Sequence, residues 1–313
     1  MTPASSVDAA TLATVTVTFN PDPLLLEIQL RALPRNCIKL VVDNASHAES
    51  FSKTEAIAEQ LPGVRLVRNA TNLGLAAAVN LGVQLLNKLK PVPQFVLLLD
   101  QDSEPQPGSI EIMLAAFHNL EAGGQHVGCI GPQLRDPETG LTHGFHQCTR
   151  WRWKRVYPSA ASSSPVACAN VNGSGTLVRV SLFLQLGGLD SGFFIDHVDT
   201  EWSFRVLASG YTLWGVPNAI FNHRMGRSSV RFWWFGWRLW PARSPQRHYY
   251  LFCNAVALMR KTYVPRTWKL WAVAKLVMTA TVVAIAGPQR SKQLSNMTRG
   301  IVAGMRRGEK PNG

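Results

Sequence analysis

The segment FVLLLDQDS at Phe95–Ser103 decides the fold class of this chain. Its five leading apolar residues predict a β-strand that is buried on both faces, as strands in the middle of a parallel sheet are. The strand stops at Asp100-Gln101-Asp102, which places two carboxylates at the end of an apolar run. Burying such a pair is costly, and a bound cation that prefers oxygen ligands, Mg²⁺ or Mn²⁺, is the simplest compensation. The alternative is that Asp102 or Ser103 caps the helix that follows.

Strand-like and helical patterns alternate upstream and downstream of this segment. The predicted strands are Leu12–Thr18, Ile38–Val42, Val64–Val67 and Phe95–Leu99. The predicted helices are Leu24–Leu33, Ser52–Leu61, one that begins after Asn72, and one that carries Ile110, Met113, Leu114 and Phe117. Such alternation predicts βαβ crossovers and an α/β fold, in which a mostly parallel sheet is flanked by helices.

Polar side chains follow each of the four predicted strands. Ligands of such sheets bind beyond the carboxyl ends of the strands, so these side chains are candidates for a binding site. They are Thr18 and Asn20, Asp43 and Asn44, Asn69 and Asn72, and Asp100 and Asp102. Taken singly, Asp43 also suits a turn, and Asn72 can simply cap a helix.

Three features beyond residue 170 add possible chemistry. Gly173-Ser174-Gly175 either lets the backbone approach a ligand closely or forms a tight turn. Asp199 and Glu201 lie in the aromatic stretch Phe193–Arg205, where burial can raise a carboxyl pKa and create a general base. The same acids also suit the first turn of a helix. His223 can bind a metal through a neutral imidazole, although a lone histidine is more often structural.

The basic charge is concentrated at the C-terminal end. The chain has 313 residues, is 46% hydrophobic and has a net charge of +13. Residues 224–313 hold 17 Lys and Arg but a single acid, Glu309, and six tryptophans are interleaved with these cations. This pattern is typical of amphipathic helices that lie on an anionic membrane surface. The alternative is that the tryptophans pack on the rest of the protein and the cations are solvated.

The cysteines and the apolar segments indicate where in the cell the protein is located. Five scattered cysteines without paired spacing predict neither a zinc site nor a disulfide framework, and favour a reducing cytosol. The first fifteen residues lack the basic start and long apolar run of a signal peptide. Leu270–Gly287 is interrupted by Lys275, so we expect an interfacial or buried helix rather than a membrane span.

Seven motifs give the chain a resemblance to family 2-type glycosyltransferases with the GT-A fold, over about residues 12–226. They are TVTFNP (16–21), VVDNAS (41–46), NLGLAAAVNLG (72–82), LLLDQDS (97–103), NGSGTLVR (172–179), GLDSGFFIDHVDTEWSFR (188–205) and NHRMG (222–226). The DQDS form and the IDxVDxEW stretch look most similar to bacterial rhamnosyltransferases that build surface polysaccharides such as the lipopolysaccharide O-antigen.

The resemblance implies an inverting transfer of L-rhamnose from dTDP-L-rhamnose to a glycan or lipid-linked acceptor, with a UDP-sugar as the alternative donor. It implies these residue roles: Thr18, Asn20, Asp43, Asn72, Gly74 and Asp100 for the nucleotide-sugar donor; Asp102 and His223 for Mg²⁺ or Mn²⁺; Gly173, Ser174 and Trp202 for the acceptor; and Asp199, with Glu201, for catalysis. The family's acidic motif is usually an adjacent Glu-Asp pair, whereas Val198 precedes Asp199 here. We assign the catalytic base to Asp199.

We predict a catalytic domain over residues 1–226, with a nucleotide-sugar half at about 12–103 and an acceptor half at about 104–226. Residues 227–313 are expected to form a basic helical extension on the cytoplasmic face of the cell membrane. Nucleic acid is not an expected partner, because the basic segment carries no recognisable binding motif. A nucleotidyltransferase would need a Gly-rich basic loop where this chain has FNPDP at Phe19–Pro23. The remaining alternatives are a catalytically silent assembly partner and a nucleic-acid-binding protein.

Overall fold

The computed structural model describes residues 11–224, 229–233 and 237–307, and these fall into two compact units. Unit 1 comprises residues up to Gln147 together with Arg155–Gly192 and Val198–Arg224. Unit 2 comprises Cys148–Lys154, Phe193–His197 and the residues from Met225 onward. Parts of three sequence-based predictions lie outside the described residues: most of the segment scanned for a signal peptide, the end of the NHRMG motif, and Trp234 in the basic tail.

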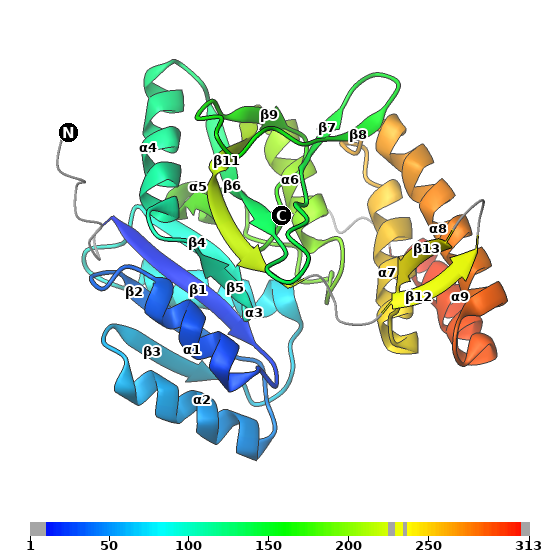
Figure 1. Cartoon of the computed structure of the whole chain (residues 1–313), viewed down its shortest axis with the longest axis horizontal. Helices are drawn as coiled ribbons and strands as arrows, with labels where there is room; N and C mark the ends of the chain where they lie inside the picture. The colour runs from blue at the N-terminus through cyan, green and yellow to red at the C-terminus, as the bar shows by residue number, and fades with distance from the viewer. Residues whose placement is uncertain (1–10, 225–228, 234–236, 308–313) are drawn as a thin grey trace. The chain divides into compact units, whose positions relative to one another are not determined.

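Unit 1 is built on one nine-stranded mixed sheet (Figure 1). The strands are β1 (Leu12–Thr18), β2 (Ile38–Asp43), β3 (Val64–Arg68), β4 (Phe95–Asp100), β5 (Ser103–Pro105), β6 (Val127–Arg135), β9 (Val166–Cys168), β10 (Thr176–Arg179) and β11 (Thr212–His223). Their order is β3-β2-β1-β4-β10-β6-β11-β5, with β9 also paired to β11. The first four strands are mutually parallel, whereas β10 runs antiparallel to both of its neighbours.

Helices cover both faces of this sheet. They are α1 (Pro23–Ala32), α2 (Ala48–Gln60), α3 (Leu75–Asn87), α4 (Ser109–Ala122), α5 (Val180–Gln185) and α6 (Val198–Ala208). The main core joins α1, α2 and α4 to one side of the central strands, including Phe95, Leu97 and Leu99 of β4. On the other side α3 approaches β1 so closely that a β-carbon on Gly82 would meet Val15 at 2.7 Å. Both faces of β4 are therefore buried, and the predicted α/β class is confirmed.

Unit 2 is largely helical. It contains α7 (Pro245–Met259), α8 (Arg266–Ala286) and α9 (Arg290–Arg306), and the two-stranded sheet of β12 (Ser229–Trp233) with β13 (Trp237–Pro241). The remaining strands of the described residues, β7 (Phe145–Cys148) and β8 (Trp153–Val156), pair with each other, and most of their residues belong to unit 1. In the described part of the chain, α8 is the one helix long and apolar enough to cross a membrane by length and composition, and 22% of its most apolar window is buried.

Two glycines allow α9 to pack closely on α7. A β-carbon on Gly300 would lie 2.5 Å from the carbonyl oxygen of Tyr249, and one on Gly304 would lie 2.5 Å from that of Cys253. The four-residue spacing of these glycines puts both on one face of α9. The backbones of α7 and α9 therefore meet without intervening side chains, and this contact leads into the small core of Leu251, Phe252, Val283 and Met297.

Replacing Gly304 with Ala should separate α7 from α9. Because the added methyl group would meet backbone rather than a movable side chain, we expect a loss of about 1–3 kcal/mol in the free energy of unfolding. Ser295→Ala, at an exposed position of the same helix, is the control and should change stability by less than about 0.5 kcal/mol. Urea unfolding measures both, and equal stabilities of the two variants would contradict the close packing.

Candidate active site

The pairing of β5 with β11 brings together residues that are 120 positions apart. Ser103 lies opposite His223 in this antiparallel pair. Asp102, just before β5, places its Oδ1 3.4 Å from Nδ1 of His223. The same imidazole nitrogen is 3.3 Å from the Ser103 hydroxyl. The two residues expected to hold a metal are therefore neighbours, and backbone pairing fixes their separation.

The charge around His223 is strongly negative. Burial alone would lower the pKa of His223, but the hydrogen bond with Asp102 and the charges of the nearby carboxylates outweigh it and raise the pKa. The carboxylates that act on His223 are Asp100, Asp102 and Asp136, and carboxylate oxygens are also suitable ligands for a divalent cation.

The residues fit a metal that is only partly enclosed by protein. In the described residues, no three His, Cys, Asp or Glu side chains converge on one point. Mg²⁺ commonly takes one or two protein carboxylates and completes its shell with substrate phosphates and water. Asp102 and His223 can therefore hold Mg²⁺ or Mn²⁺ together with phosphate oxygens of a ligand.

The Gly173-Ser174-Gly175 turn connects this pair to α6. The Ser174 hydroxyl, which is buried, hydrogen-bonds the Ser103 hydroxyl. A β-carbon on Gly173 would lie 3.8 Å from Cβ of Asp199, an ordinary van der Waals distance, so the turn and the start of α6 are adjacent. Gly175 has a φ of +86°, and its N–H donates to the carbonyl oxygen of Leu98. The turn thus lies between β4 and the first turn of α6.

Asp199 and Glu201 have different surroundings. Asp199 is half-buried in the first turn of α6, and its Oδ1 accepts from the N–H of Thr200 at 2.8 Å. Glu201 is 1% exposed, and Arg205 binds both of its carboxylate oxygens at 2.8 Å. Arg205 also donates to the carbonyl oxygens of Leu186 and Gly188, which ties α6 to the turn after α5. Glu201 therefore has a structural partner.

Three of the predicted donor residues meet at the ends of β1 and β2. The Thr18 hydroxyl donates to Oδ1 of Asp43 at 3.2 Å, and Asp43 is fully buried. Ser46 donates to Asp43 through both its backbone N–H and its hydroxyl. Asn20 has a φ of +47° and accepts from the N–H of His47. The Asp43 carboxylate thus organises the loop that follows β2.

Asn44 arranges the loop before α3. Its Oδ1 accepts from the side chain of Asn69 and from the N–H of Leu73, and its amide donates to Oδ1 of Asn72 at 2.9 Å. Asn72 also accepts from the N–H of Gly74. The predicted residues Asn72 and Gly74 are therefore held together by Asn44, which is only 3% exposed.

Gln29 is an important residue that sequence reasoning missed. It lies in α1 with 0% exposure, and its amide donates to the carbonyl oxygens of Asp100 and Ser103 at 2.5 and 2.7 Å. Its own oxygen accepts from the hydroxyl of Thr16 at 3.0 Å. Gln29 thus holds the turn that carries Asp102. The available signal is a polar residue between the apolar Ile28 and Leu30 of the helical segment LLLEIQL at residues 24–30.

Trp202 is not brought to this site as a surface side chain. It is 2% exposed, packs against Phe183 with ring centroids 5.1 Å apart, and donates from Nε1 to the sulfur of Cys129. We expected Trp202 at the acceptor, but its ring belongs to the core, so the acceptor side of the proposed site is reduced to Gly173 and Ser174.

The five residues before α6 belong to unit 2 and are held tightly there. Asp196 forms an ion pair with Arg247 at 3.1 Å. The fully buried Asn254 donates to the carbonyl oxygens of Ile195 and Asp196 at 2.7 and 3.0 Å. Asp196 and His197 both have a φ of +63°, which is uncommon for residues other than glycine. These contacts therefore fix a strained segment that leads directly into the helix carrying Asp199.

Comparison with known proteins identifies related sequences. Residues 15–187 match the sequence family described as Glycosyl transferase family 2. The chain is 28% identical over 272 residues to the dTDP-rhamnosyl transferase RfbF of Shigella flexneri, covering 86% of this chain and 87% of the relative. It is 29% identical over 252 residues to the N-acetylglucosaminyl-diphospho-decaprenol L-rhamnosyltransferase of Mycobacterium tuberculosis, covering 70% and 78% of the two chains.

Solved structures show the same fold at lower identity. GalNAc-T7 with UDP, GalNAc and Mn²⁺ superposes with a TM-score of 0.60 at 18% identity, covering 93% of this chain and 55% of that chain. The chain thus spans little more than half of GalNAc-T7. The mannosyltransferase PcManGT of Pyrobaculum calidifontis with GDP-Man and Mn²⁺ gives a TM-score of 0.54 at 16% identity, covering 94% and 85%. These likenesses concern the fold alone.

Replacing Gln29 with Leu should destabilise unit 1 and loosen the turn at Asp102. The change keeps the side-chain size but leaves two carbonyl oxygens without their donor, which costs about 1–3 kcal/mol. Gln60→Leu, at an exposed position of α2, is the matched control. Urea unfolding gives the free energies, and an unchanged stability in Gln29→Leu would show that the amide does not hold the turn.

Replacing Asn254 with Ala should release the segment before α6. We expect a loss of about 1–3 kcal/mol, because two carbonyl oxygens and Arg307 lose their partner. Hydrogen exchange of peptides covering residues 193–205 should accelerate, whereas Asn119→Ala at an exposed position of α4 should leave it unchanged. Wild-type exchange rates in Asn254→Ala would mean that the segment is held by other contacts.

Proposed function

The chain belongs to glycosyl transferase family 2, and on this premise we propose that it is an inverting rhamnosyltransferase. Its substrates are a dTDP-L-rhamnose donor and a lipid-linked or polysaccharide acceptor in the synthesis of a cell-surface glycan. The observation that carries the choice of sugar is that two relatives, each matched over most of its length, are named as rhamnosyl transferases. The family was predicted from the ordered motifs and the α/β fold from the alternation of strand-like and helical patterns, and both are confirmed. The donor and the acceptor stay proposals.

The donor binds beyond the carboxyl ends of β1, β2 and β4. We assign its nucleoside to the loops that carry Thr18, Asn20 and Asp43, and to the loop of Asn72 and Gly74. Because Asp43 is fully buried and hydrogen-bonded to Thr18, its contribution is to shape the loop rather than to contact the base. Asp100 lies at the end of β4 and is assigned to the ribose side of the donor.

Asp102 and His223 hold the divalent cation in this proposal. Mg²⁺ or Mn²⁺ supplies positive charge that offsets the negative charge of the leaving nucleoside diphosphate. The 3.4 Å separation of their side chains and the carboxylate charges around them support the assignment. Gln29 contributes by fixing the carbonyl oxygens on both sides of Asp102.

Asp199 is the proposed catalytic base. It takes the proton of the acceptor hydroxyl while that oxygen bonds to the anomeric carbon. The bond from this carbon to the diphosphate oxygen breaks, and its electron pair leaves with dTDP. Attack from the opposite face inverts the anomeric centre, so a β-linked donor gives an α-L-rhamnoside. The engagement of Glu201 by Arg205 supports Asp199 over Glu201.

The reaction is proposed to take place at the cytoplasmic face of a membrane. The name of the mycobacterial relative includes a decaprenol-linked acceptor, and this supports a lipid-linked acceptor for this chain. Several large apolar side chains of α8 are exposed, among them Leu270, Val273, Val277 and Ile285. Exposed apolar residues together with many cations suit an anionic membrane surface.

Asp199→Asn should retain donor binding but lower kcat for rhamnose transfer by about 10²–10⁴-fold, since a positioned base contributes that much. The assay combines purified protein, bacterial membranes and dTDP-rhamnose beside UDP-sugars, with Mn²⁺ or Mg²⁺. Glu59→Gln, an exposed carboxylate of α2, is the control. Chelation with EDTA should abolish turnover, and added Mn²⁺ should restore it. Full activity in Asp199→Asn, or turnover of a UDP-sugar alone, would overturn the corresponding part of the proposal.

A further inference from the structure

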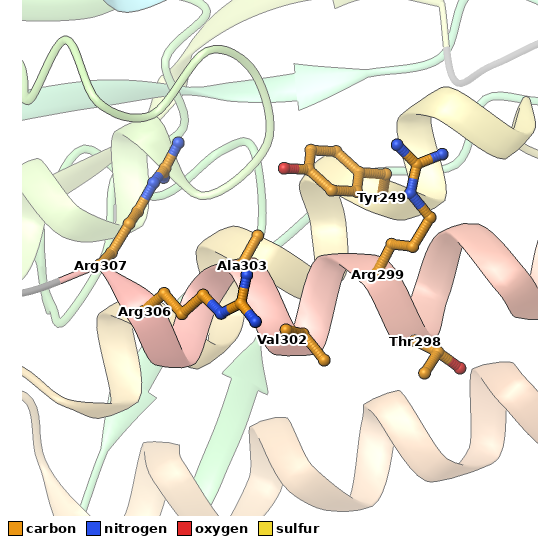
Figure 2. A pocket seen from close by; sticks show the side chains of 7 residues that line it. All are labelled: Tyr249, Thr298, Arg299, Val302, Ala303, Arg306 and Arg307. Carbon is orange, nitrogen blue, oxygen red and sulfur yellow. The ribbon is translucent and has the colours of Figure 1, made fainter.

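A cleft of about 570 Å³ lies on the surface of unit 2 beside the contact of α7 with α9, and it is lined by Tyr249 of α7 and by residues at the C-terminal end of α9. Figure 2 shows its lining: the ring of Tyr249 lies over α9, and Arg299 and Arg307 extend from α9 toward the side of that ring. The remaining lining residues are Thr298, Val302, Ala303 and Arg306. The cleft is thus lined by an aromatic ring and three arginine side chains, together with smaller apolar residues.

The arginines of this cleft are not matched by acids of the same unit. Among the described residues of unit 2 the only carboxylate is Asp196, which is paired with Arg247. Arg307 donates to the amide oxygen of Asn254, which is a neutral partner. Arg299 and Arg306 are exposed and have no ion pair within the described part of the chain. Three like charges around one cleft repel one another, so an anion that binds there gains from all three.

The cleft also borders on apolar surface. Val302 lines it and is 36% exposed, and on the same helix Ile301 and Met305 are 36% and 51% exposed. A soluble anion would leave these side chains in water. A lipid, by contrast, offers a charged headgroup and an apolar tail in one molecule. A guanidinium group can donate two parallel hydrogen bonds to two oxygens of one phosphate.

We propose that this cleft is a binding site for the phosphate of an anionic membrane phospholipid. Arg299 and Arg306 bind the phosphate oxygens, Tyr249 covers the headgroup, and Val302 and Met305 contact the adjoining acyl chain. The inference rests on the proposed membrane location and deepens it, because it replaces a diffuse attraction of basic residues with one defined site.

The test compares two double variants that remove the same charge. Arg299→Gln with Arg306→Gln alters the cleft, and Arg260→Gln with Lys292→Gln alters exposed cations of the same unit outside it. Binding is measured by flotation with phosphatidylcholine vesicles that contain roughly 30% phosphatidylglycerol, which gives the vesicles an anionic surface. Thermal unfolding verifies that both variants are folded.

A defined site predicts that the cleft variant loses at least about tenfold more vesicle affinity than the control variant, because it loses paired guanidinium–phosphate bonds. Equal losses from the two variants would overturn the site and leave only diffuse attraction. Binding of glycerol 1-phosphate without vesicle binding would overturn the lipid assignment. Rhamnose transfer from dTDP-rhamnose to an acceptor in detergent tests the proposed function separately, so failure of the two ideas can be distinguished.

Discussion

The antiparallel pairing of β5 with β11 is the constraint on which the candidate site depends. It sets His223 opposite Ser103 and beside Asp102, although the two segments are far apart in the sequence. The Ser174 hydroxyl joins the same cluster, and the neighbouring Gly173 faces Asp199. Backbone pairing thereby brings together the proposed metal ligands Asp102 and His223. The short turn at Gly173 then links them to the proposed base, Asp199. Gln29 anchors the assembly from α1.

Much of the nucleotide-binding half could be predicted from the sequence, because each of its strands is a short apolar run followed by a polar residue. The observed β1 coincides with the predicted Leu12–Thr18, and β2, β3 and β4 each extend one residue beyond the prediction. β5 could not be predicted, since SEP at residues 103–105 has no apolar pattern and becomes a strand only by pairing with β11. Local patterns therefore specify strands of the central sheet, whereas its last edge arises from tertiary contacts.

The same distinction holds for individual side chains. Motif order selected Asp102, Asp199 and His223, and the structure places Asp102 beside His223 and Asp199 beside Gly173, while their roles stay proposals. Motif order did not reveal that Trp202 is a core residue. The sequence of an acidic motif is the same whether its tryptophan faces a ligand or the protein interior. Nor did motif order reveal Gln29 or Asn254, whose importance lies in the carbonyl oxygens they satisfy rather than in any recognisable spacing.

Unit 2 is assembled from three separate segments of the sequence. This limits where the chain can be truncated or joined to a segment of a relative. Phe193–His197 is encoded in the middle of the catalytic region but takes its hydrogen bonds from α7. A chain ended at Arg224 would keep these residues and lose Arg247 and Asn254, exposing a left-handed backbone segment without support. A chimera that exchanges only the C-terminal helices would mismatch the same contacts. We therefore expect the helical region and the inner segment to change together among homologues.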